Sequence, residues 1–177
     1  MRKILMLGGI HGVGKSFLCK RIKETCKCEI YSASQLMRDY YQNKVDDNKR
    51  VEDIKLNQNI LLSAINTYVP RESRIILDGH FCLLNTNNNV LEIPFETFQS
   101  IGVNGIIVLT DNADIIINRL NARDGTQYSS DFVNNFQDKE INYAKLIAKK
   151  LNVELLVCKN PVYDNDILDF INKIMGE

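Results

Sequence analysis

A nine-residue stretch, GGIHGVGKS at residues 8–16, constrains the fold of this chain more than any other feature of the sequence. Its fixed glycines and the Lys-Ser pair that ends it match the phosphate-loop pattern at every defined position. An apolar run precedes the stretch, and residues with helical spacing follow it. A strand that turns into a helix in this way leaves backbone N–H groups unpaired at the positive end of the helix. The stretch therefore predicts a binding site for a phosphate group.

The residue types in this loop suit the separate tasks of phosphate binding. Gly12 and Gly14 allow the main chain to approach a ligand closely. Lys15 can reach the β and γ phosphates of a nucleotide, and the Ser16 hydroxyl can ligate Mg²⁺. A surface turn that matches by chance is the alternative, and the strand-to-helix context argues against it. The residues expected at the nucleotide are Gly9, Ile10, His11, Gly12, Val13, Gly14, Lys15, Ser16 and Phe17, with His11 either lining the loop or packing outward.

Apolar runs alternate with stretches of helical spacing along the whole chain. The runs are nearly continuous in hydrophobicity, as strands of a parallel sheet covered on both faces require. This alternation predicts an α/β domain with ligands at the carboxyl ends of its strands. The expected strands are 3–9, 29–32, 74–79, 105–110 and 153–159, and the expected helices are 15–25, 33–44, 50–67, 112–122, 131–151 and 164–175.

Two polar segments interrupt the alternation. Residues 85–104 contain an asparagine cluster and a proline before a short amphipathic piece, which predicts a loop followed by a short helix. Residues 122–131 are polar with a central glycine, and such insertions at the ligand end of a sheet often form lids.

Length and composition narrow the class of protein. A chain of 177 residues fits one domain, 1–177, with one core. Its 22 basic and 22 acidic residues cancel, so neither nucleic acid nor a membrane surface is an expected partner. The five cysteines are odd in number and lack a disulfide framework, and Cys26 and Cys28 are more consistent with buried or incidental thiols than with a metal site. With an N-terminal segment too short for a secretory signal, these features predict a cytoplasmic location.

Asp78 closes the apolar run that ends in LDGH at residues 77–80. In nucleotide-binding folds a carboxylate at a strand end holds Mg²⁺ or receives the proton of an acceptor. A turn cap with Gly79 is the alternative for an isolated Asp-Gly pair. His80 either contacts a substrate or caps the strand.

Together with the loop, four further segments resemble those of the P-loop nucleoside monophosphate kinases in their order along the chain. The resemblance is strongest to the archaeal-type adenylate kinase group and related small ATP-binding proteins of the AAA type. The segments beyond the loop are YSASQLMRD at 31–39, LDGH at 77–80, IINRLNARDG at 116–125 and CKNPVYD at 158–164. The resemblance implies a P-loop NTPase fold, a three-layer α/β/α sandwich. Its parallel sheet has five strands in the order 2-3-1-4-5, and a small lid lies at about residues 119–131.

The resemblance also implies roles for acceptor residues. Arg38 falls on an arginine that grips the phosphate of the acceptor, for which a planar guanidinium is suited. Ser32, Ser34 and His80 would line the same pocket. A solvated helix charge is the alternative for Arg38, and a helix cap is the alternative for the serines.

Residues on the donor side are implied in the same way. Arg119 and Arg123, four residues apart, would lean over the phosphates and neutralise charge in the transition state. Salt bridges to Asp114 or Asp124 are the alternative. Asn160 and Pro161 would border the adenine. The catalytic set implied is Lys15, Asp78, Arg119 and Arg123, with Mg²⁺ on Ser16 and Asp78.

The function that these residues imply is transfer of the γ-phosphoryl group of ATP·Mg²⁺ to a nucleoside monophosphate or a similar small acceptor. No Lys or Arg lies between His80 and Gln99, where common adenylate kinases carry a second acceptor arginine. This departure favours a kinase with another acceptor, such as a nucleoside, a metabolite or an RNA end. An ATP-dependent switch without an acceptor is the alternative from another class. The oligomeric state is left open.

Overall fold

The computed structural model describes residues 1–26, 28–44, 54–85, 87–125, 127–159 and 165–176. The strands are β1 (Lys3–Gly8), β2 (Glu29–Ser32), β3 (Arg74–Asp78), β4 (Cys82–Leu84), β5 (Val90–Glu92), β6 (Val103–Thr110) and β7 (Glu154–Lys159). The helices are α1 (Lys15–Thr25), α2 (Ala33–Lys44), α3 (Ile54–Tyr68), α4 (Phe95–Ile101), α5 (Ala113–Asp124), α6 (Ser130–Leu151) and α7 (Asn165–Met175).

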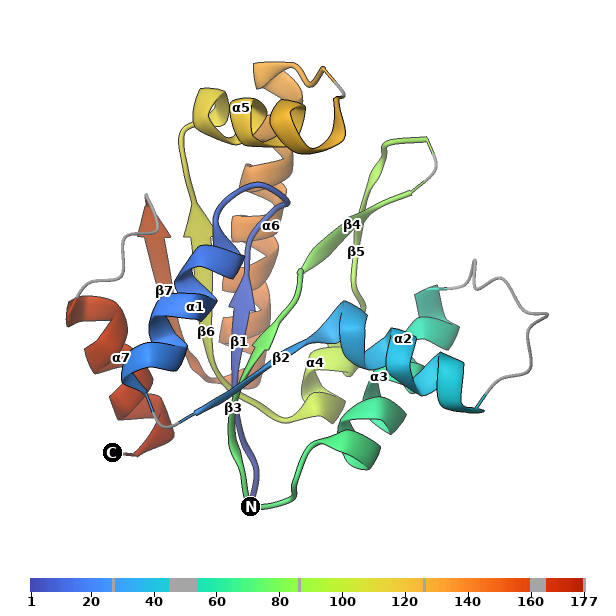
Figure 1. Cartoon of the computed structure of the whole chain (residues 1–177), viewed down its shortest axis with the longest axis vertical. Coiled ribbons are helices and arrows are strands. Elements are labelled where there is room, and N and C mark those ends of the chain that lie inside the picture. The colour runs from blue at the N-terminus through green and yellow to red at the C-terminus, as the bar shows by residue number, and fades with distance from the viewer. Residues whose placement is uncertain (27, 45–53, 86, 126, 160–164, 177) are drawn as a thin grey trace.

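The main sheet has five strands in the order β2-β3-β1-β6-β7 (Figure 1). All four pairs of neighbouring strands are parallel. Counted along the chain without the β4–β5 hairpin, these strands have the order 2-3-1-4-5. The predicted α/β fold is therefore confirmed.

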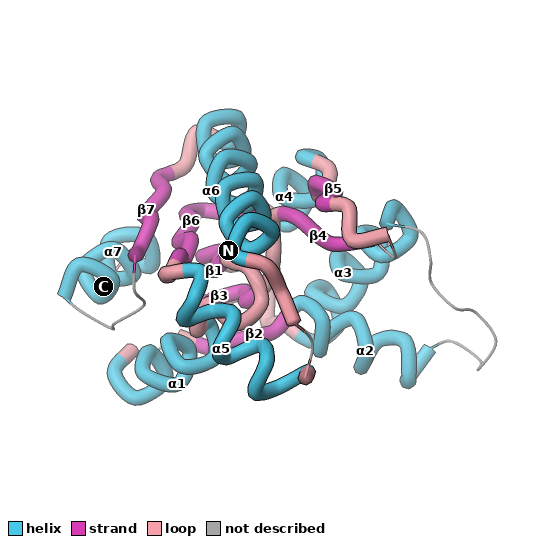
Figure 2. The backbone as a smooth tube through the Cα atoms, turned by 90° about the horizontal axis from the view of Figure 1, so that it is seen from above, coloured by secondary structure: helices cyan, strands magenta, loops and turns pink. Residues whose placement is uncertain are grey.

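Helices cover both faces of this sheet. Helices α1 and α7 lie on one face, and α4 and α6 lie on the other (Figure 2). The consecutive residues Ile4 to Leu7 of β1 are each at most 3% exposed, although their side chains alternate between the two faces. Burial on both faces explains why the central strands read as continuous apolar runs rather than as alternating ones.

The segment from residue 82 to residue 92 differs from its expected structure. The sequence predicts a loop from residue 85, whereas the structure forms an antiparallel hairpin in which Cys82 pairs with Glu92 and Leu84 with Val90. The Asn85 side chain closes the turn, since its Oδ1 accepts hydrogen bonds from the N–H groups of residues 87 and 89, both at 2.9 Å. Strands of three residues are too short to show a recognisable alternation. The short helix expected after this segment is present as α4.

The polar stretch 122–131 joins two helices above the sheet. Helix α5 continues to Asp124 and ends at Gly125, which has a left-handed φ of 66°. Helix α6 starts behind the cap Ser129, whose side chain accepts a hydrogen bond from Phe132 N at 3.2 Å. Figure 1 shows α5 lying across one end of the sheet, beyond the loop that joins β1 to α1.

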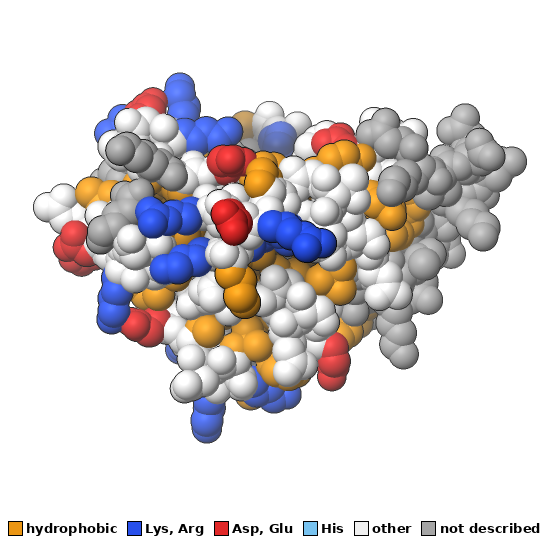
Figure 3. All heavy atoms as spheres, turned by 90° about the horizontal axis from the view of Figure 1, so that it is seen from below, with side chains coloured by type: hydrophobic (Ala, Val, Ile, Leu, Met, Phe, Trp, Pro, Cys, Tyr) orange, Lys and Arg blue, Asp and Glu red, His pale blue; other side chains and the backbone are white. Residues whose placement is uncertain are grey.

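The surface carries charges of both signs. On the face seen from below, basic and acidic side chains are scattered among apolar and other groups (Figure 3). Among the helices that the structure describes, none has the length and apolar character needed to cross a bilayer.

Candidate functional site

The loop between β1 and α1 has a backbone that only glycine tolerates at several positions. Gly9, Gly12 and Gly14 have φ angles of 135°, 80° and 111°. A Cβ on Gly9 would lie 2.9 Å from the Leu109 carbonyl oxygen, and one on Gly12 would lie 2.9 Å from Leu120 Cγ. The loop thus wraps closely around the start of α1, against β6 and α5.

The first turn of α1 has unpaired backbone donors. The first hydrogen bond of the helix joins Leu18 N to the Gly14 carbonyl at 3.1 Å. Within the described residues, the N–H groups of Lys15, Ser16 and Phe17 donate to no protein acceptor. Three free donors at the positive end of an 11-residue helix are suited to bind an anion. The loop therefore fits a phosphate group.

Lys15 lies at the centre of this loop, and its side chain is only 8% exposed. Its Nζ donates to the Gly9 carbonyl at 2.6 Å and lies 3.3 Å from His80 Nε2. Burial lowers the pKa of Lys15, while the nearby carboxylates of Asp78 and Glu140 oppose that shift. The ammonium is thus held over the loop by main-chain contacts.

Asp78 and His80 follow β3 at the same edge of the sheet. Asp78 is in register with Leu7 of β1 and Ser32 of β2, so it lies between the loop and the start of α2. Burial raises the pKa of Asp78, and the charge of Lys15 opposes the rise. Burial beside Lys15 lowers the pKa of His80 to about 2, so His80 is neutral and its Nε2 can accept from Lys15.

A cavity of about 490 Å³ joins these groups. Most of the predicted site residues share its wall: Ile10, His11, Gly12, Gly14, Lys15, Ser16, Ser32, Ser34, Asp78, His80 and Arg123. The remaining wall is mostly apolar and comes from β1, α2, α3, the hairpin and α4: Met6, Ala33, Met37, Leu61, Gly79, Leu83, Ile93, Thr97, Phe98 and Ile101. The cavity therefore has a polar end at the loop and an apolar end between α2 and α4.

Other predicted residues lie outside this wall. The Arg38 side chain is exposed and donates to Gln35 Oε1 at 2.8 Å, so its predicted phosphate contact stays a prediction. The Phe17 side chain is 60% exposed, which leaves its backbone N–H as the group that faces a ligand. Asn160 and Pro161 fall outside the described residues.

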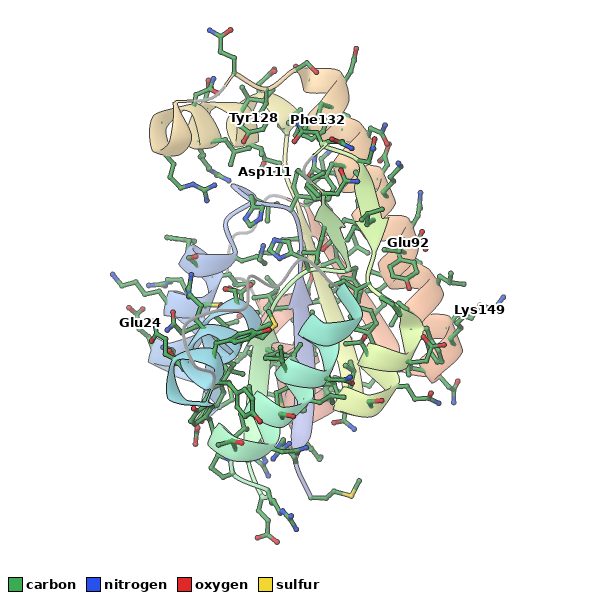
Figure 4. The ribbon with its side chains drawn as sticks, turned by 90° about the vertical axis from the view of Figure 1, so that its right-hand side faces the viewer. Glu24, Glu92, Asp111, Tyr128, Phe132 and Lys149 are labelled. Atoms are coloured by element: carbon green, nitrogen blue, oxygen red, sulfur yellow. The ribbon has the colours of Figure 1, made fainter. Side chains whose placement is uncertain are left out.

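Arg119 contacts the back of the loop rather than the cavity. Its Nη1 donates to the carbonyls of Gly12 and Val13, both at 3.2 Å, and to Asp111 Oδ2 at 2.9 Å. The sequence suggested Asp114 or Asp124 as its alternative partner, and the structure pairs it with Asp111. The Asp124 side chain falls outside the described residues. Figure 4 shows Asp111 beneath Tyr128 and Phe132, whose stacked rings have centroids 6.1 Å apart.

Glu140 on α6 is a site residue that the sequence analysis missed. It is 1% exposed and accepts hydrogen bonds from Gly9 N at 3.0 Å, Phe81 N at 2.9 Å and Cys82 N at 2.7 Å. Burial raises the pKa of Glu140, and the three backbone donors oppose that rise. One carboxylate thus ties the loop to the segment that carries Asp78 and His80.

Gln137 also holds backbone groups, from a position almost one helical turn before Glu140. Its side-chain amide exchanges two hydrogen bonds of 3.0 Å with the backbone of Asp111. A signal for both residues was present in the sequence, because Gln137 and Glu140 interrupt the apolar stripe of the helix expected at 131–151. A polar residue at a core position of a helix indicates a buried hydrogen-bond partner.

Comparison with known proteins agrees with this geometry. A model of the AAA domain family matches residues 8–137, a stretch that includes the loop, Asp78 and both arginines of α5. The chain belongs to this family. No curated protein sequence matches the chain.

Two solved structures are similar to this chain. TT1252 from Thermus thermophilus is similar with a TM-score of 0.54 and 13% identity, over 99% of this chain and 97% of that protein. A gluconokinase from Sinorhizobium meliloti 1021 is similar with a TM-score of 0.49 and 13% identity, over 98% of this chain and 90% of that protein. At this identity the similarity to TT1252 concerns the fold of this AAA domain protein alone.

Proposed function

We propose that this chain is a P-loop kinase, which transfers the γ-phosphoryl group of ATP to a small acceptor. The observation that carries this proposal is the shared cavity. It joins an anion site at the loop and Lys15 to a separate end lined by Ser32 and Ser34, with Asp78 between the two. A switch that only hydrolyses ATP has no need for the second end.

The donor half follows from the loop. The N–H groups that open α1 would hold the phosphates of ATP, and Lys15 would move from the Gly9 carbonyl to the β and γ phosphates. Ser16 would hold Mg²⁺, which neutralises phosphate charge when bound. Of the two roles predicted for Asp78, Mg²⁺ binding or acceptance of a proton, we propose the second. The contact of Asn160 and Pro161 with adenine stays a prediction.

Transfer itself requires positioning and charge neutralisation. The acceptor oxygen attacks the γ phosphorus, the bond to the β–γ bridging oxygen breaks, and ADP leaves. A hydroxyl acceptor gives up its proton in this step, and Asp78, which lines the cavity, would receive it. Arg123 reaches the cavity from α5, where its guanidinium can stabilise the charge that develops on the phosphoryl oxygens.

The lid proposed at about 119–131 would close over this site. It comprises the end of α5, the connection and the start of α6. Closure would exclude water, which would otherwise compete with the acceptor for the phosphoryl group. We also propose a cytoplasmic location and one domain over 1–177. The resemblance to the archaeal-type adenylate kinase group stays part of this proposal.

An Arg123→Ala variant tests the proposal. We expect ADP formation in the presence of acceptor to fall about 100-fold, because one donor to the transferring group is lost. The dissociation constant for ATP, measured by calorimetry, should change by less than about threefold. Arg21→Ala is the matched control, since Arg21 pairs on the surface with Glu24 at 3.0 Å. Equal rates in all three proteins would contradict the role of Arg123 and the transfer mechanism with it.

A further inference from the structure

The end of the cavity farthest from the loop is lined by apolar side chains. Met37 of α2, Leu61 of α3 and Leu83 of β4 share this wall with Phe98 and Ile101 of α4. The Phe98 ring stacks on Phe81 with centroids 5.0 Å apart and an interplanar angle of 19°. Such a wall is suited to a ring or another apolar group, because burial of apolar surface is its main source of binding energy.

One hydroxyl in this wall has no hydrogen-bond partner. Thr97 is only 4% exposed, lines the cavity, and has a buried Oγ1 without a partner among the described residues. Its backbone N–H already donates to the Pro94 carbonyl at 3.0 Å. An unpaired buried hydroxyl costs free energy, and rotation about χ1 moves Oγ1 among the three staggered positions of the side chain. Thr97 can therefore offer one hydrogen bond to a ligand.

The charges near this end disfavour a phosphate group. The Asp78 carboxylate lies in the cavity wall, and the Ser32 and Ser34 hydroxyls lie 3.0 Å from each other. The Arg38 guanidinium is outside the wall and bonds to Gln35. Among the described wall residues, Lys15 and Arg123 are the only lysine or arginine, and both belong to the donor half. A dianionic phosphate would face a carboxylate and apolar side chains, which is unfavourable.

We propose that the acceptor is an uncharged compound with a ring and a free hydroxyl, and that Thr97 pairs with a polar atom of that ring. This inference rests on the proposed kinase function. The ring lies between α2 and α4, and the reacting hydroxyl lies beside Ser32, Ser34 and Asp78. The hydroxyl oxygen forms the new bond to phosphorus, ADP leaves, and the hydroxyl proton passes to Asp78. The product is a phosphate monoester, whose charge disfavours rebinding at this end.

Paired compounds test the acceptor class. Adenosine, cytidine, thymidine and pyridoxine would each be compared with its own 5′-phosphate in an assay of ADP formation from ATP and Mg²⁺. At least one uncharged member should stimulate ADP formation at least tenfold more than its phosphate. Faster turnover of the phosphates would overturn this inference and leave the kinase function standing. Stimulation by neither set, with ATP bound, would overturn the kinase function and this inference together.

The Thr97→Val variant distinguishes a role of Thr97 in acceptor binding from a role in stability. The loss of one hydrogen bond should raise KM for the uncharged acceptor about 3- to 10-fold, with KM for ATP unchanged. The melting temperature of the free protein should stay the same or rise, because an unpaired hydroxyl is removed. Thr97→Ser, which keeps the hydroxyl, should retain the KM of the parent. Thr67→Val is the matched control, since Thr67 is exposed on α3. A KM that Thr97→Val leaves unchanged would overturn the contact with Thr97.

Discussion

The single carboxylate of Glu140 binds three backbone N–H groups from two separate segments. Residues 9 and 81 are far apart in sequence, and both segments form walls of the cavity. Glu140 is therefore a positioning residue, because it sets the distance between Lys15 and the residues that follow β3 without lining the cavity itself. Its buried acceptor oxygens make it sensitive to substitution.

Glu140→Leu should lower the free energy of unfolding by about 3 kcal/mol, because three buried N–H groups lose their acceptor. Glu140→Gln should lower it by less, since the amide keeps one oxygen for Gly9 and Phe81. Urea denaturation measures both values. Asp138→Asn on the exposed side of the same helix is the control, and it should change stability by less than about 0.5 kcal/mol. A Glu140→Leu protein as stable as this control would contradict the role of Glu140.

Burial of neutral His80 should make the free energy of unfolding fall as the pH falls. Its pKa is about 2 in the folded protein, against an ordinary value of 6.5, so the unfolded chain binds the proton first as the pH falls. The parent should therefore lose about 1 kcal/mol more stability than His80→Gln between pH 7.5 and pH 5.5. Urea denaturation at both pH values measures the difference. Parallel losses in the two proteins would show that His80 is not buried as a neutral ring.

At the scale of single residues, the sequence predicted the residues that the backbone conformation of the loop requires. The loop glycines and Lys15 were recognisable because their spacing follows from local geometry. The hydrogen-bond partners of Glu140 were not recognisable, because they lie 58 to 131 residues away in the chain. The unpaired Oγ1 of Thr97 was not recognisable either, because it depends on packing around the cavity.

At the scale of elements, α5 and α6 support the loop from behind. Gln137 of α6 holds the backbone of Asp111, Asp111 pairs with Arg119 of α5, and Arg119 contacts two loop carbonyls. This chain of contacts connects the proposed lid to the phosphate site. The Arg119 side chain is 45% exposed, so its pair with Asp111 contributes little to global stability and acts mainly on loop geometry.

Asp111→Asn should weaken ATP binding about three- to tenfold, because Arg119 loses its charged partner and holds the loop less firmly. Calorimetry with Mg²⁺ measures the dissociation constant. Asp114→Asn is the control, since Asp114 lies exposed in the first turn of α5, the helix that carries Arg119. If both variants bind ATP as the parent does, then Arg119 does not position the loop.

Elements with a recognisable apolar pattern were predictable, and the two three-residue strands of the hairpin were not. The five strands of the main sheet and helices such as α1 and α2 lie where the apolar spacing placed them. The β4–β5 hairpin escaped prediction because its strands pair only three residues each and are partly covered by other elements.

At the scale of the whole molecule, one hydrophobic cluster includes residues from both faces of the main sheet. We therefore expect the chain to unfold as one cooperative unit, as one domain over 1–177 would. Urea transitions followed by far-ultraviolet circular dichroism and by tyrosine fluorescence should coincide. Two separate midpoints would indicate that a segment of the chain, such as the proposed lid, unfolds independently.

The central claim is that the loop between β1 and α1 binds the phosphates of ATP through Lys15. Calorimetric titration of ATP with Mg²⁺ into the parent, Lys15→Ala and Lys20→Ala tests it most directly, because Lys20 is exposed on the same helix. We predict saturable binding by the parent and by Lys20→Ala, and at least tenfold weaker binding by Lys15→Ala. Absence of binding by the parent, or equal affinity in all three proteins, would contradict the account.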